Sequence, residues 1–184
     1  MIRKNKGQVW VETVIYTLIG LALIAIVLAF FTPKFTGAKD SLIVEQSIES
    51  LKEFDERINT VLVSPSNRRS FEITMKKGEL FINGDDDEIV FILREITNPY
   101  SQPGVEVDDG RVKILTETGQ KSNTVTLRLK YGNSINLGNI ANGQFGEDEK
   151  KYTRSATPYT FFIENMGIDT DGKIKVGVRE STEG

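Results

Sequence analysis

The residues of this chain that could do chemistry are carboxylates, because its 184 residues include no histidine and no cysteine. Their absence excludes disulfides, thiolate nucleophiles, imidazole acid–base catalysis and the usual zinc sites. The sequence also contains no phosphate-binding loop, no G-x-S-x-G nucleophile motif and no paired motif of nucleophile and base. An enzyme built on this chain would need a carboxylate site. We predict that the protein is not an enzyme and uses no cofactor.

Two acidic segments have the oxygen atoms that a divalent cation prefers. The first, Asp85-Asp86-Asp87-Glu88, also fits the solvated tip of a hairpin, and we favour that interpretation. The second, Asp169-Thr170-Asp171-Gly172, is similar to the opening of a calcium loop. However, no acid follows Gly172 at the spacing that such a loop needs, so a plain turn is favoured. We predict no metal site in either segment.

A third carboxylate, Glu12, lies inside an apolar run from Val9 to Phe31. This run of 23 residues is long enough to cross a bilayer as a helix. The preceding flank, Met1–Lys6, is basic, so the positive-inside rule places the N-terminus in the cytoplasm and the bulk of the chain outside the cell. A cleaved secretory signal is disfavoured, because the run is too long and no small-residue cleavage site follows it.

Glu12 is costly in this position. A charge at the centre of a membrane helix costs on the order of 2.5–3.5 kcal/mol, and less near the interface. One interpretation is that Glu12 is solvated at headgroup depth beside Trp10, an interfacial aromatic. The other is that the carboxylate is functional and has a cationic partner, as intramembrane charges usually do.

The residues around Glu12 favour the second interpretation. The basic flank, the triplet Lys6-Gly7-Gln8, the acid at Glu12 and the uncharged helix that follows together resemble the class III signal peptide of archaeal type IV pilin-like proteins. The resemblance implies that a prepilin-type peptidase cuts between Gly7 and Gln8 on the cytoplasmic side. The mature chain would then begin at Gln8, with Glu12 as its fifth residue.

The same resemblance implies an assembly role for these residues. In a filament, Glu12 of one subunit would pair with the new α-amino group on Gln8 of its neighbour, and the two charges would compensate each other. The chain departs from the family at Trp10, where a small hydroxyl residue is frequent, and at Tyr16, where a leucine is frequent. The resemblance covers only about the first 30 residues.

A second helical segment is predicted from Lys39 to Val63. At 100° per residue its apolar side chains share one broad arc, and charged residues occupy the rest. Pro33, between the two segments, is expected to kink or interrupt the helix. The apolar arc comprises Ile43, Val44, Ile48, Leu51, Phe54, Ile58, Val61 and Leu62. Such a segment should pack its apolar face against another part of the protein outside the cell.

From Ser70 onward the apolar period changes to two, which is typical of strands. Turn signals such as Asn83-Gly84 and Asp108-Asp109-Gly110 separate about eight short strands. Residues 125–131 give the cleanest alternation, whereas Gly138–Lys151 are predicted to form a loop. The sequence predicts an α+β fold, in which a long N-terminal helix packs on a C-terminal antiparallel sheet or sandwich.

These elements define four segments: a cleaved leader (1–7), a transmembrane and assembly helix (8–33), an amphipathic helix (34–66) and an extracellular β-rich domain (67–184). A net charge of −3 gives no reason to expect a nucleic-acid partner. The expected partners are a prepilin-type peptidase, the lipid bilayer, a pilin assembly machinery, and further copies or other pilins. The alternative is a single-pass, membrane-anchored surface binding module that never polymerises.

Overall fold

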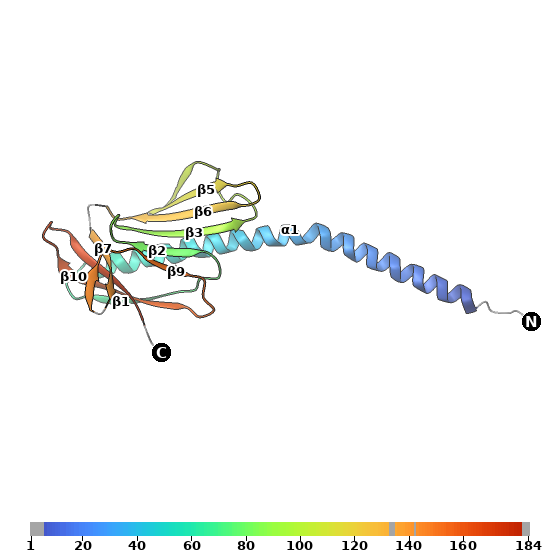
Figure 1. Ribbon diagram of the computed structural model, residues 1–184, viewed down its shortest axis with the longest axis horizontal. Coiled ribbons are helices and arrows are strands. Elements are labelled where there is room, and N and C mark those ends of the chain that lie inside the picture. Colours follow the sequence, from blue (N-terminus) through green and yellow to red (C-terminus); the bar gives the residue numbers. More distant parts are fainter. Residues whose placement is uncertain (1–5, 133–134, 142, 182–184) are drawn as a thin grey trace, which may run out of the picture. The chain divides into compact units, whose positions relative to one another are not determined.

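The computed structural model describes residues 6–132, 135–141 and 143–181 (Figure 1). The chain divides into two compact units, Met1–Lys39 and Asp40–Gly184, called unit 1 and unit 2 below. The part of unit 1 that the structure describes is helical. Unit 2 contains the rest of that helix and all of the strands.

The helix, α1, spans Lys6–Val61 and is assigned without a break at residue 33. The interruption that we predicted at Pro33 is therefore wrong. Pro33 has no N–H to donate to the Ala29 carbonyl, so the helix lacks one backbone hydrogen bond there but continues past it. Two hydroxyl groups bond other carbonyls close to this point: Thr32 Oγ1 donates to the Leu28 carbonyl at 2.6 Å, and Thr36 Oγ1 donates to the Thr32 carbonyl at 3.1 Å.

The part of α1 in unit 2 confirms the predicted amphipathic arc. Its central apolar residues are at most 3% exposed: Val44, Ile48, Leu51, Phe54, Ile58 and Val61. The ring of Phe54 lies 4.9 Å from that of Phe71 and 6.0 Å from that of Phe161. This half of the helix therefore belongs to the core of unit 2 and supplies apolar area that the strands need to bury.

The strands form two sheets, and their bounds are β1 (Arg68–Ile73), β2 (Glu79–Asn83), β3 (Glu88–Ile96), β4 (Glu106–Asp109), β5 (Val112–Thr118), β6 (Asn123–Lys130), β7 (Ile135–Ala141), β8 (Gln144–Gly146), β9 (Lys150–Thr153), β10 (Tyr159–Ile168) and β11 (Ile174–Glu180). One sheet has the order β1-β10-β11-β7-β8, and the other β4-β5-β6-β3-β2-β9. All pairs are antiparallel except β7 and β11, which are parallel. The inward residues of both sheets and of α1 share one apolar core, which confirms the α+β fold.

The segment Gly138–Lys151 was predicted as a loop, and this prediction is wrong for most of its length. Strand β7 continues to Ala141, and β8 and the first residues of β9 follow. Gly138 is an integral part of this hairpin, because a Cβ atom there would lie 2.5 Å from Cζ of Phe145. The glycine that suggested a loop is therefore the residue that lets an aromatic ring cover the strand.

Polar contacts also join α1 to the six-stranded sheet. The Asp40 carboxylate, 5% exposed, accepts hydrogen bonds from the backbone N–H of Thr97 (2.9 Å), the Thr97 hydroxyl (2.7 Å) and Nζ of Lys77 (3.0 Å). Further along the helix, the Asp55 carboxylate accepts a bond from Arg111 at 2.9 Å. These contacts hold α1 to the residue directly after β3, Thr97, and to the residue directly before β5, Arg111.

Candidate functional site: the exposed apolar half of α1

Unit 1 exposes a continuous apolar surface along α1. The exposed large apolar side chains from Trp10 to Phe31 each have at least 48% of their surface accessible, and Trp10, Tyr16 and Phe30 reach 71%. Among the described residues, α1 is the one helix that is long and apolar enough to cross a membrane. A soluble protein rarely leaves so large an apolar surface uncovered, so this surface requires an apolar environment from lipid or from other chains.

The polar groups of this surface differ in how they are satisfied. Thr17 Oγ1 donates to the Val14 carbonyl at 2.8 Å, so its hydroxyl is compensated within the helix. The Glu12 side chain is exposed, and within the described residues it makes no hydrogen bond or ion pair. No other charged residue lies between Trp10 and Pro33. Glu12 is therefore the one charged residue between Trp10 and Pro33, and it is exposed.

The residues of the predicted cleavage site, Lys6, Gly7 and Gln8, lie in the first turn of α1, and their side chains fall outside the part that the structure describes. Residues 8 and 12 are four positions apart on a helix, so they occupy the same face, one turn from each other. A cut between Gly7 and Gln8 would therefore create an α-amino group one turn before the Glu12 carboxylate. The processing and assembly roles of these residues stay predictions.

The acidic segment Asp85–Glu88 does not converge on a common point. The Asp87 carboxylate accepts bonds from the backbone N–H of Leu137 (2.9 Å) and from Nζ of Lys173 (3.0 Å). Glu88 instead forms an ion pair with Arg128 at 3.3 Å. Among the described residues, no group of three or more acidic, histidine or cysteine side chains could hold a metal ion. Asp87 joins the β2–β3 turn to the start of β7.

The second acidic segment forms a turn between β10 and β11. The Asp169 carbonyl accepts the backbone N–H of Gly172 at 3.0 Å, and Gly172 has a φ of 79°, which favours glycine. The Lys175 ammonium, the Thr170 backbone and Asn136 all donate to the Asp169 carboxylate. These bonds lower the pKa of Asp169 to about 2. The carboxylate is therefore ionised and internally compensated at neutral pH.

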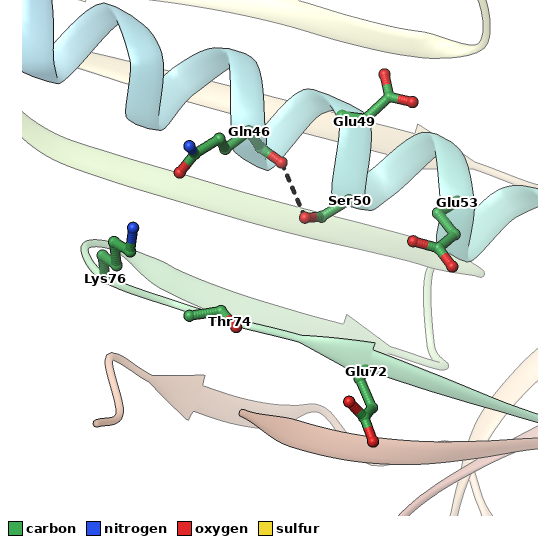
Figure 2. A pocket seen from close by; sticks show the side chains of 7 residues that line it. All are labelled: Gln46, Glu49, Ser50, Glu53, Glu72, Thr74 and Lys76. Carbon is green, nitrogen blue, oxygen red and sulfur yellow. Dashed lines mark hydrogen bonds between the residues drawn. The ribbon is translucent and has the colours of Figure 1, made fainter. Parts of the chain in front are cut away.

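A polar groove lies between α1 and β1 in unit 2 (Figure 2). Its volume is about 380 Å³. One wall is the helix stripe Gln46, Glu49, Ser50 and Glu53, and the other is formed by Glu72, Thr74 and Lys76. Strand β1 is an edge of its sheet, so no further strand lies along this side. No prediction from the sequence pointed to this groove. Its two walls nevertheless follow patterns that the sequence contains. The helix residues of the groove are three or four positions apart, and the residues of the opposite wall are two positions apart.

No family model, no curated protein and no solved structure matches this chain.

Proposed function

We propose that this chain is a structural subunit, major or minor, of an archaeal type IV pilus-like surface filament, held in the membrane by α1 before assembly. The observation that carries the proposal is the exposed apolar half of α1 with a single carboxylate, Glu12, near its start. A helix of this kind can use two apolar environments in turn, the bilayer and a bundle of identical helices.

The arrangement of unit 2 supports this proposal. Its core includes its own half of α1, so the apolar residues of this core are buried without help from Trp10–Phe31. The apolar surface of unit 1 is therefore not needed to complete the fold of unit 2. It is free to contact lipid first and other subunits later, which is what a subunit that moves from membrane to filament requires.

In the proposed filament, the Glu12 carboxylate would determine how neighbouring subunits align along the axis. After cleavage before Gln8, the new α-amino group is a cation near neutral pH. In an apolar helix bundle, an unpaired carboxylate and an unpaired amine are each costly, whereas the pair is compensated. Pairing between neighbouring subunits would then favour one axial register over others. Cleavage would remove the leader Met1–Gly7, whose basic residues would hold the N-terminus in the cytoplasm until then.

The first test is to isolate membrane and surface fractions and to sequence the N-terminus of the protein in each. We expect a start at Gln8 in the surface fraction, which should contain filaments on electron microscopy. A Glu12→Ala variant should be processed and folded but should form few or no filaments. A Thr13→Ala variant is the matched control, because it truncates the neighbouring side chain without removing a charge, and it should assemble.

A surface-exposed protein that keeps Met1 would contradict the proposal. It would favour the alternative, a membrane-anchored binding module that does not polymerise. A protein that starts at Gln8 and carries Glu12→Ala without any loss of surface function would favour that alternative too.

A further inference from the structure

The outer face of α1 in unit 2 carries four exposed carboxylates: Glu45, Glu49, Glu53 and Glu56. We call this set the acidic stripe. At 100° per residue, these four positions fall within an arc of about 80° on one side of the helix. Figure 2 shows two of them, Glu49 and Glu53, beside the groove, with Glu72 of β1 on the opposite wall.

The acidic stripe is poorly compensated within its own chain. Carboxylates four residues apart on a helix repel each other, and this spacing occurs twice, at Glu45–Glu49 and Glu49–Glu53. Among the described residues, Glu53 forms an ion pair with Arg57 at 3.0 Å, and Glu49 interacts electrostatically with Lys52, which is itself paired with Asp109 at 2.7 Å. In the part of the chain that the structure describes, Glu45, Glu49 and Glu56 form no ion pair. The stripe therefore presents negative charge to whatever lies beside the helix.

A complementary segment lies earlier on the same helix, in unit 1. Lys34 and Lys39 are exposed, and within the described residues neither has a carboxylate within ion-pair distance. No acidic residue occurs from Thr13 to Lys39. The exposed rings of Phe31 and Phe35 accompany these lysines. We call Lys34–Lys39 the basic turn. It combines positive charge with apolar area, which suits it to the flank of another helix.

The basic turn and the acidic stripe of one chain are not paired with each other in this structure. Their nearest members, Lys39 and Glu45, are six residues apart on α1, a rise of about 9 Å, and about 120° apart around the helix axis. An ion pair needs the two charged atoms within about 4 Å, and among the described residues none joins Lys34 or Lys39 to the stripe. Both segments are therefore available to another molecule.

We infer that the acidic stripe of one subunit binds the basic turn of a second copy of this chain. The inference rests on the proposed function, because parallel helices in a filament are what bring the two segments together. Matching Lys34 with Glu45, and Lys39 with Glu49 or Glu53, requires the two copies to be displaced by 10 to 14 residues along α1, about 15–21 Å. The contact is heterologous, so each copy offers both halves of it and the assembly can continue without closing.

The contact also explains the position of Leu42. This residue is 56% exposed and lies on α1 between the basic turn and the acidic stripe. A neighbouring helix that covers the stripe would cover Leu42 as well. Charge would then select the register of the two helices, while Leu42, Phe31 and Phe35 would supply apolar area to the interface.

The test uses assembled filaments and a zero-length carbodiimide, which joins a lysine amine to a carboxylate only where the two are in contact. We expect a cross-linked dimer whose digest contains Lys34 or Lys39 joined to Glu49, Glu53 or Glu56. Such a product cannot form within one straight helix, so it reports a contact between copies. Raising the salt concentration before cross-linking should reduce its yield, because exposed ion pairs are screened.

A charge exchange makes the result decisive. Glu49→Lys with Glu53→Lys should reduce filament yield by about tenfold or more, because like charges would then face each other across the contact. Adding Lys34→Glu and Lys39→Glu to the same chain should restore much of that yield. Asp85→Lys with Asp86→Lys, at the exposed β2–β3 turn, changes as much charge and is the control that should leave assembly intact.

The outcomes separate this inference from the proposed function. Filaments that start at Gln8 but give only other cross-links, or no recovery on charge exchange, would overturn the inference and leave the filament proposal standing. Filaments that never form in the unaltered protein would overturn both.

Discussion

The two halves of α1 contain similar apolar residues in opposite surroundings. Phe54 in unit 2 is fully buried, whereas Phe31 in unit 1 is 55% exposed. In unit 2 the apolar residues recur on one side of the helix, and strands from both sheets cover them. In unit 1 they surround the helix on all sides. A helix that is apolar on one face finds its partner within its own domain, whereas one that is apolar all round needs a membrane or other helices.

The two halves of α1 should therefore affect different properties of the protein. Replacements in the buried half should change the free energy of unfolding of unit 2. Replacements in the exposed half should leave that free energy unchanged and act on membrane insertion or assembly. Each prediction below tests this division.

The largest effect is expected for Phe54→Ala. The Phe54 ring packs against Phe71 and Phe161, and removing a buried phenyl group typically costs about 3–5 kcal/mol. The measurement is urea unfolding of the full chain in detergent micelles, followed by the near-ultraviolet circular dichroism of its tyrosines. Four of the five tyrosines lie in unit 2, so the signal reports on that unit.

Phe31→Ala is the matched control, with the same change of side chain on the same helix. It should shift the unfolding midpoint of unit 2 very little. If both variants lowered the stability of unit 2 by similar amounts, the two halves of α1 would not be independent, and the division drawn above would fail.

A smaller loss is expected for Asp40→Asn, at the first residue of unit 2. The carboxylate accepts bonds from Thr97 and Lys77, and an amide cannot accept all of them. Leaving a buried donor without its partner costs about 1–3 kcal/mol. Urea unfolding measures this loss. Asp148→Asn is a suitable control, because Asp148 is exposed and its side chain forms no ion pair among the described residues.

Asp40 also predicts a dependence on pH. Burial raises the pKa of Asp40, but the bonds from the Thr97 side chain and backbone and from Lys77 outweigh it, so the pKa is lowered below 3.8. A lowered carboxylate pKa contributes stability that is present above the unfolded-state value and lost as the pH falls through the folded-state value. Stability should therefore decline below about pH 4, and the decline should be shallower in Asp40→Asn. Equal slopes would mean that other carboxylates dominate.

Local periodicity accounts for what the sequence predicted well. The amphipathic arc of α1 and the alternation in β6 are patterns of neighbouring residues, and packing preserves both. Glu12 and the triplet before it are likewise local. Their predicted roles, however, concern a peptidase and a neighbouring subunit, and these remain predictions.

Contacts between distant residues explain what the sequence did not predict. Asp40 is 57 residues from Thr97 and 37 from Lys77, and nothing in its local pattern indicates that it is buried. The parallel pairing of β7 with β11 depends on how the chain crosses between sheets. The short edge strands β8 and β9 are polar on their exposed side, so their composition is that of a loop.

The smallest effect is expected for Glu53→Gln. This change removes the ion pair with Arg57, in which both side chains are more than 40% exposed, and also the repulsion from Glu49. Exposed pairs of this kind contribute about 0.3–0.5 kcal/mol, so the stability of unit 2 should be nearly unchanged by urea unfolding. A loss above about 1 kcal/mol would mean that Glu53 helps to hold unit 2 together. The outer face of α1 would then stabilise unit 2, as its inner face does. This result would contradict the inference that the outer face binds a second copy.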